Sequence, residues 1–244
     1  MLDEIILAIV QAATEFLPVS SSGHLALVSG LFGEPDVFFF TVLHVASLLA
    51  VLIFTRKEIF KLLSFDKKYK KMWLYLILGT IPAAFVGYFY SGFVERQFSS
   101  LLFVGSAFIF TGIVLLFTKN AENNFRLNWK NSFVVGLAQV AAIFPGISRS
   151  GMTISVAKLL GVKNEEAFKF SFLLFVPLVL GALVVESGKM YFSLELLVAF
   201  VIALVLSLFF LKLLYKIVKG GKFWMFSFYC FAVGVISILI YFLR

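Results

Sequence analysis

The stretch TEFLPVSSSGH, residues 14–24, places a glutamate, three consecutive serines and a histidine within a long apolar region of the chain. A second stretch, FPGISRSG at residues 144–151, does the same with an arginine at its centre. Polar and charged groups are costly in apolar surroundings unless they are hydrogen-bonded or paired. Proline and glycine also interrupt helices. The two stretches therefore divide apolar regions into short segments, and they decide how the chain can fold.

The composition is that of a membrane protein. Of the 244 residues, 61% are hydrophobic, 14% are charged and 32 are phenylalanine. Soluble domains are roughly 45–50% apolar and about 25% charged. The single cysteine, Cys230, excludes an internal disulfide and a cysteine-rich metal site. Asp3 and Glu4 replace the basic flank of a signal peptide, so we expect the first apolar run to be retained.

Six apolar segments are long enough to cross a bilayer, which requires about 20 apolar residues. Two further regions, 4–32 and 132–161, are each broken near the middle, and their halves are too short to span. We expect both regions to form re-entrant helical hairpins. Irregular backbone at membrane depth must line a cavity or be buried in protein, so the breaks predict a polar cavity. The expected spans are 36–55, 73–91, 99–118, 166–187, 194–215 and 223–243.

The basic residues predict the orientation. With six spans and two hairpins, 17 of the 21 lysines and arginines fall on one face, in 56–71, 119–130, 158–169 and 212–222. The basic residues behind the net charge of +8 are therefore spread over several loops and form no continuous basic domain, so we expect no nucleic-acid partner. By the positive-inside rule, the crowded face is cytoplasmic. Both termini are then expected outside, with the basic loops contacting anionic lipid headgroups.

An internal repeat accounts for the two breaks. Residues 10–33 and 138–161, compared without gaps, are identical at nine of 24 positions, including Gln11/Gln139, Ser20/Ser148, Ser22/Ser150, Gly23/Gly151 and Gly33/Gly161. Each half then holds one hairpin and three spans, and an odd number of spans inverts the second half relative to the first. The predicted fold is an all-α integral membrane protein, residues 1–244, with inverted repeats at about 1–118 and 130–244 and a site near the midplane.

Each break is followed by an expected helix start, near Gly23 and Gly151. Helix N-termini carry free N–H groups and a partial positive charge, so they attract phosphate. The flanking serines add hydroxyl donors, and an arginine supplies a planar cationic fork for phosphate oxygens. The residues expected to bind phosphate are Ser20, Ser22, Gly23, Ser148, Arg149, Ser150 and Gly151.

Structural explanations exist for the same residues. Ser20–Ser22 could cap a helix, His24 could be a hydrogen-bonded structural residue, and Glu15 could neutralise Arg149 as a buried pair. An ionisable residue within the membrane nevertheless marks a functional site by default. His44 has no polar cluster beside it in the sequence, and we interpret it as structural or as supporting the site from outside.

At these residues the sequence resembles the undecaprenyl-diphosphate phosphatases, the BacA/UppP family of bacterial cell-wall lipid recycling. TEFLPVSSSGH and PGISRSG are similar to the two signature motifs of that family. The segments VLHVASLLAV at 42–51, GTIPAAFVG at 79–87 and FSFLLFVPLVLGA at 170–182 sit where its recurring segments fall. The match covers nearly the whole chain in order.

The resemblance implies a bacterial inner-membrane hydrolase that removes the terminal phosphate of a polyprenyl diphosphate and thereby serves peptidoglycan synthesis, cell shape and bacitracin resistance. Glu15, Ser21, His24, Ser148 and Arg149 match functional positions of the family, whose chemistry is placed on the outward-facing side. The family is described as needing Mg²⁺ or Ca²⁺, for which Glu15 is the candidate ligand. The family usually has a glutamate where this chain has Gln11, which puts a two-carboxylate metal site in doubt.

The chemistry expected at the site is phosphoryl transfer, which depends on positioning and charge neutralisation. We expect Arg149 to hold the diphosphate, Ser21 to attack with His24 as base, and Glu15 to orient His24 or hold the cation. Direct attack by His24 is the alternative. Gln11 and Gln139 are expected to support the site from outside. The partners are the lipid substrate and membrane lipids, with a homodimer as an option.

A rival function is transport. An inverted repeat with broken helices is also a carrier's architecture. The same cavity could therefore flip a polyprenyl phosphate across the bilayer.

Overall fold

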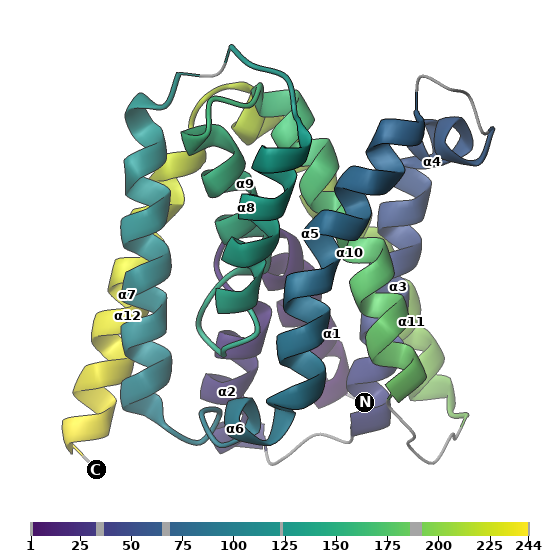
Figure 1. Cartoon of the computed structure of the whole chain (residues 1–244). Coiled ribbons are helices and arrows are strands. Elements are labelled where there is room, and N and C mark those ends of the chain that lie inside the picture. Colours follow the sequence, from purple (N-terminus) through teal and green to yellow (C-terminus); the bar gives the residue numbers. More distant parts are fainter. Residues whose placement is uncertain (1, 33–36, 65–68, 123, 186–191, 244) are drawn as a thin grey trace.

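The computed structural model describes residues 2–32, 37–64, 69–122, 124–185 and 192–243, and these residues form a bundle of helices (Figure 1). A single isolated bridge, between Phe125 and Val162, is the only β-type pairing among them. The helices are α1 (Leu2–Phe16), α2 (Ser21–Phe32), α3 (Val37–Phe54), α4 (Arg56–Leu63), α5 (Lys70–Phe89), α6 (Ser91–Glu95), α7 (Leu101–Phe117), η1 (Thr118–Asn120), α8 (Trp129–Ala141), α9 (Arg149–Leu159), α10 (Asn164–Val185), α11 (Leu194–Lys219), η2 (Phe223–Met225) and α12 (Phe226–Leu243).

The long helices agree with the expected spans to within a few residues. Among the described residues, α5, the α7–η1 segment, α10, α11 and the η2–α12 segment are long and apolar enough to cross a membrane. A sixth crossing is provided if α3 and α4, which meet at a 76° bend, are taken together. The expectation of an all-α multi-pass membrane protein is therefore confirmed. Residue 36 and residues 186–187 of the expected spans lie outside the described residues, as does Gly33 of the repeat.

Both broken regions consist of two short helices. Helices α1 and α2 are separated by residues 17–20, which contain Pro18, and helices α8 and α9 by residues 142–148. The chain turns through left-handed backbone in each break, with φ of +64° at Ser20 and +92° at Gly146. A Cβ at residue 146 would lie 2.5 Å from the carbonyl oxygen of Val104, so glycine is required there.

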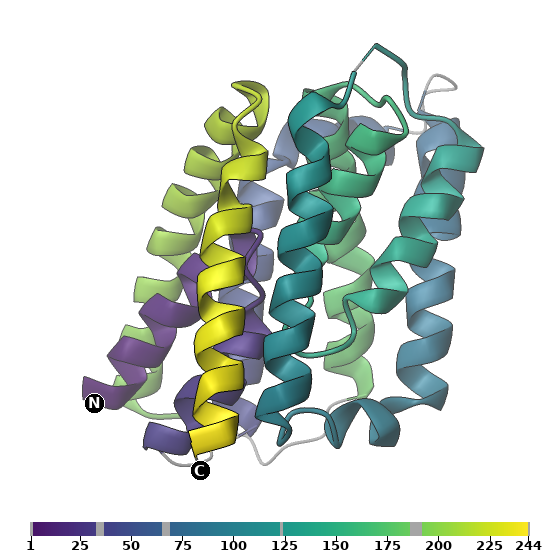
Figure 2. The same ribbon diagram turned by 90° about the vertical axis from the view of Figure 1, so that its left-hand side faces the viewer.

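The helices pack in a reciprocal pattern. Helix α1 lies on α11, and α8 lies on α5, while α7 and α12 run side by side (Figures 1 and 2). Helix α3 contacts α10 and α11, and α10 contacts α3 and α5. Helices α1 and α8 are the first helices of the two broken regions, and each of them packs on a long helix from the other half of the chain.

An aromatic core lies beside the first break. Phe16 is fully buried at the end of α1, with ring centroids 5.8 Å from Phe172 and 6.3 Å from Phe175 of α10. Phe168 packs 4.6 Å from Phe172. These large apolar side chains exclude water from one side of the break. The polar groups of the break therefore face away from this apolar core.

The two ends of the bundle differ. Helix α1 begins and α12 ends toward the lower end of Figure 1, whereas α4 and the α7–α8 connection lie at the upper end. The upper end carries Arg56 and Lys57 on α4 together with Lys119 and Arg126 of the connection. Basic residues thus gather at this end of the bundle, although Arg96 follows α6 at the other end and Arg149 lies in the second break.

Candidate active site

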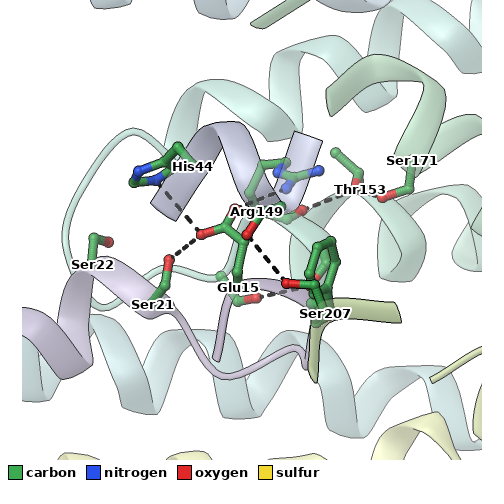
Figure 3. Close-up of polar contacts among 12 residues, drawn as sticks. Glu15, Ser21, Ser22, His44, Arg149, Thr153, Ser171 and Ser207 are labelled. Carbon is green, nitrogen blue, oxygen red and sulfur yellow. Dashed lines mark hydrogen bonds and ion pairs between the residues drawn. The ribbon is translucent and has the colours of Figure 1, made fainter. Parts of the chain in front are cut away.

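Glu15 lies at the centre of the polar cluster, at the last turn of α1 (Figure 3). Its side chain is only 8% exposed. The Oε2 atom accepts a hydrogen bond from Ser21 Oγ at 2.6 Å and another from Gln11 Nε2 at 3.1 Å. The Oε1 atom accepts from Arg149 Nη2 at 3.1 Å. The carboxylate therefore joins a hydroxyl of the first break to the cation of the second.

Arg149 is the first residue of α9, directly after the second break, and its guanidinium reaches the first break. Its ion pair with Glu15, at 3.1 Å, is the pairing that the sequence offered as a structural explanation of the two charges. The guanidinium also lies over the Phe175 ring, with Cζ 4.1 Å from the ring centroid. Its Nη1 is buried and has no hydrogen-bond partner among the described residues. Arg149 thus retains an unused donor that an anion could satisfy.

Ser20 and Ser148, which match in the repeat, make equivalent bonds. Ser20 Oγ accepts from the N–H of Gly23 at 3.2 Å, and Ser148 Oγ accepts from the N–H of Gly151 at 3.1 Å. Both serines therefore cap the following helix, which was the structural explanation considered for the serine run. Both also line the cavity described below, so capping does not remove them from the site.

The two breaks bond directly to each other. Ser20 Oγ also accepts from the N–H of Gly146 at 3.2 Å. In the opposite direction, Ser150 Oγ donates to the carbonyl of Phe16 at 2.9 Å. These bonds bring residues about half the chain apart into one unit, and the serine runs meet as the sequence predicts.

A cavity of about 180 Å³ lies where the breaks meet. Polar groups make up much of its wall, and apolar side chains of the second break close the rest. The lining residues are Thr14, Glu15, Ser20, Ser21, Ser22, His44, Ala142, Ile143, Ile147, Ser148 and Arg149.

His24 does not line this cavity. Its Nδ1 lies 2.8 Å from the carbonyl oxygen of Ser20, and its Nε2 lies 2.7 Å from the hydroxyl of Tyr229 on α12. The imidazole stacks on the Tyr229 ring and meets the edge of Phe108. Both ring nitrogens are thus engaged away from Ser21, whose hydroxyl contacts Glu15 instead. The structure does not bring His24 to the hydroxyl that it was expected to activate.

His44 does line the cavity, although the sequence analysis placed it outside the site. Its Nε2 lies 3.8 Å from Glu15 Oε2 and 3.4 Å from Gln11 Nε2. Figure 3 shows the imidazole facing the Glu15 carboxylate. The available signal was that a histidine in an apolar span is costly and therefore marks a functional position.

The remaining predicted residues have structural contacts. Gly23 and Gly151 are absent from the cavity wall, and a Cβ at Gly23 would lie 2.8 Å from the Cα of Gly146. Ser150 is fully buried by its bond to Phe16. Gln139 donates to the carbonyl of Gly79, tying α8 to α5, whereas Gln11 contacts Glu15. These glycines therefore permit the close approach of the two breaks.

The donor set fits a cation that arrives with a ligand and does not fit a complete protein cage. No three histidine, cysteine, aspartate or glutamate side chains gather within the described ranges. One carboxylate, that of Glu15, borders the cavity, whereas Gln11 is fully buried behind it and does not line the wall. Mg²⁺ is commonly bound through one or two carboxylates plus substrate phosphates. The single carboxylate of Glu15 satisfies that minimal requirement.

Comparison with known proteins places the chain in a recognisable group. A family model described as "Bacitracin resistance protein BacA" matches residues 4–236. A protein named undecaprenyl-diphosphatase from Methanococcus vannielii is 41% identical over 97% of this chain and 99% of its own. One of the same name from Methanococcus maripaludis strain C7 is 42% identical over 94% of this chain and 96% of its own. A third, from Thermosipho africanus, is 36% identical over 98% and 100%.

Proposed function

Because this chain belongs to the bacitracin resistance protein BacA family, we propose that it hydrolyses undecaprenyl diphosphate to the monophosphate and inorganic phosphate. The observation that supports the assignment best is the bonded series Ser21–Glu15–Arg149 at the wall of a polar cavity inside an apolar bundle. It combines a hydroxyl nucleophile, a proton acceptor and a cation for phosphate, which are the groups that phosphoryl transfer requires.

Ser21 is the proposed nucleophile and Glu15 its base. Ser21 Oγ–H already donates to Glu15 Oε2 at 2.6 Å, so the proton passes to the carboxylate as Oγ attacks the terminal phosphorus. The bond from that phosphorus to the bridging oxygen breaks, and its electron pair leaves with the polyprenyl phosphate. Water then attacks the phosphorus of the phosphoserine, the bond from phosphorus to Oγ breaks, and Oγ takes back the proton held by Glu15. Inorganic phosphate leaves with the oxygen and protons of the water. The contacts of Ser21 favour this route over attack by His24, whose nitrogens bond elsewhere.

Arg149 is proposed to hold the phosphate. Its free Nη1 can bond to a phosphate oxygen while Nη2 remains on Glu15. Helices α2 and α9 begin at Ser21 and Arg149 beside the cavity, so the partial positive charge at their N-termini adds to the attraction. Ser20, Ser22 and Ser148 supply hydroxyls at the same wall.

A divalent cation, Mg²⁺ or Ca²⁺, is proposed to enter with the diphosphate. The carboxylate oxygens of Glu15, on the cavity wall, are the protein atoms that would hold it. Such a cation neutralises phosphate oxygens when bound. The chain's own contribution is to keep these oxygens, Ser21 and Arg149 within one small cavity.

We further propose that the two halves form an inverted repeat. The reciprocal packing of α1 on α11 and of α8 on α5 supports this, because a two-fold axis in the membrane plane would exchange these pairs. The basic end of the bundle is then cytoplasmic, both chain ends lie outside, and the broken regions are re-entrant. Relatives of this multi-pass membrane protein occur in archaeal Methanococcus as well as in bacterial Thermosipho, so its plasma membrane need not be bacterial. The mass of the purified protein in detergent tests the option of a homodimer.

The decisive experiment measures inorganic phosphate released from undecaprenyl diphosphate by the purified protein in detergent. The parent should release phosphate, Ser21→Ala should not, and Ser106→Ala, at an exposed position of α7, should match the parent. Chelation of divalent cations should suppress the activity. A parent that transfers lipid between the leaflets of a vesicle without releasing phosphate would refute the hydrolase and identify a carrier.

A further inference from the structure

Gln11 and His44 contact Glu15, the proposed base, and the proposed reaction gives neither of them a role. Gln11 and Glu15 are one helical turn apart on α1, and His44 faces them from α3. Gln11 is fully buried, and its Nε2 lies 3.1 Å from Glu15 Oε2 and 3.4 Å from His44 Nε2. A single amide nitrogen therefore lies between the carboxylate and the imidazole.

The bonds of the imidazole determine which nitrogen accepts. His44 Nδ1 lies 2.8 Å from the carbonyl oxygen of Phe40, which is only an acceptor, so Nδ1 carries the proton and donates. In the neutral ring, Nε2 then presents a lone pair. An amide nitrogen has two N–H groups. Gln11 can therefore donate one to Glu15 and the other to His44, and each acceptor receives a donor.

We infer that Gln11 and His44 act as one positioning unit, in which His44 holds the Gln11 amide and the amide holds the Glu15 oxygen that receives the proton of Ser21. This inference rests on the proposed function and assigns a role to His44 in that same reaction. Without an acceptor at residue 44, the amide of Gln11 is free to turn, because its Oε1 has no hydrogen-bond partner among the described residues. Glu15 Oε2, the atom that accepts from Ser21, would then lose its fixed hydrogen bond from Gln11.

The arrangement also explains why a glutamine suits residue 11. A carboxylate there has no N–H to donate and would face both the Glu15 carboxylate and the lone pair of His44. The amide nitrogen of a glutamine can donate one N–H group to each of these two acceptors. The identity of residue 11 is therefore linked to the presence of an acceptor at residue 44.

The test is a set of variants assayed for kcat and KM with undecaprenyl diphosphate. His44→Leu keeps the bulk of the side chain and removes the acceptor, whereas His44→Gln keeps an acceptor in its amide oxygen. We expect His44→Leu to lower kcat about three- to tenfold with little change in KM, which corresponds to the loss of one hydrogen bond. His44→Gln should restore kcat to within about twofold of the parent. Ser47→Ala, one turn further along α3 in a contact with Ser207, is the matched packing control and should behave like the parent.

A double-mutant cycle tests whether the two residues act as a unit. Gln11→Ala alone should lower kcat to about the same extent as His44→Leu, and the combined variant should be no worse than Gln11→Ala. The inference is overturned by a parental kcat in His44→Leu, by equal impairment of His44→Gln and His44→Leu, or by multiplicative losses in the double variant. If His44→Leu does not fold, His44→Phe, which also lacks the acceptor, takes its place in the cycle. Absence of phosphate release by the parent would instead reject the proposed function.

Discussion

Replacing Glu15 with glutamine should nearly abolish hydrolysis, because the carboxylate has two tasks that an amide cannot share. Its two oxygens accept from three donors, on Ser21, Gln11 and Arg149. An amide offers one oxygen and turns its own N–H groups toward at least one of those donors. Removing a general base costs about 10²–10⁴-fold in rate, or about 2.7–5.4 kcal/mol of barrier. A donor left unsatisfied in a buried site adds about 1–3 kcal/mol.

We therefore expect kcat of Glu15→Gln to fall by about 10³-fold or more, since the base and the support of Arg149 are lost together. Removing one partner of a buried ion pair costs about 3–5 kcal/mol of stability. The freed guanidinium can regain part of that from a phosphate anion. Added inorganic phosphate should therefore raise the melting temperature of Glu15→Gln more than that of the parent.

The assay is phosphate release from undecaprenyl diphosphate at saturating substrate, with thermal unfolding in the same detergent. Glu58→Gln is the matched control, because Glu58 forms an ion pair with Lys169 at 2.7 Å far from the cavity. That partly exposed pair is worth roughly 0–1 kcal/mol, so kcat should be unchanged. A Glu15→Gln enzyme that folds normally and works within threefold of the parent (roughly 0.6 kcal/mol) would refute the role of Glu15.

Three further substitutions test other parts of the site. Arg149→Lys should not rescue the activity lost in Arg149→Ala, because lysine lacks the planar fork that lies on Phe175 and serves Glu15 and phosphate together; parental phosphate release by Arg149→Lys would reduce Arg149 to a point charge. His24→Ala should lower the melting temperature by several degrees along with kcat, since it frees the Tyr229 hydroxyl and opens a space beside it; a loss of kcat at an unchanged melting temperature would point to a direct catalytic role. Gly146→Ala should reduce the yield of folded protein, measured by size-exclusion chromatography, because its Cβ meets backbone and its φ is positive; a normal yield would contradict the close packing of the breaks.

The breaks and the long helices could be predicted because their causes are local. Pro18 and the polar run after it interrupt an apolar segment, whatever surrounds them. The pairing of Arg149 with Glu15 was also within reach, since the repeat aligns the two breaks and opposite charges buried in apolar surroundings must meet.

The roles of the two histidines could not be predicted in the same way. Which face of α3 turns toward α1 depends on packing between segments 33 residues apart, so nothing near His44 in the sequence reports its contact with Gln11. His24 stands beside the serine run in the sequence. Its ring is nevertheless turned away by a tyrosine 205 residues further along the chain. The position of His24 next to the serine run suggested a contact with Ser21 that the structure does not have. The isolated position of His44 in the sequence gave no sign that it lines the cavity.

The hydrogen bonds between the two breaks can form only after both breaks have been synthesised. Ser20 accepts from the N–H of a residue 126 positions later, and Ser150 returns a bond to Phe16. At roughly 5–20 residues per second of synthesis, the first break waits about 6–25 s for its partner. During that time Glu15 is in the nascent chain without the arginine that neutralises it. The amino-terminal half alone thus lacks the bonds that join the two breaks, and they can form only once the second break has been synthesised.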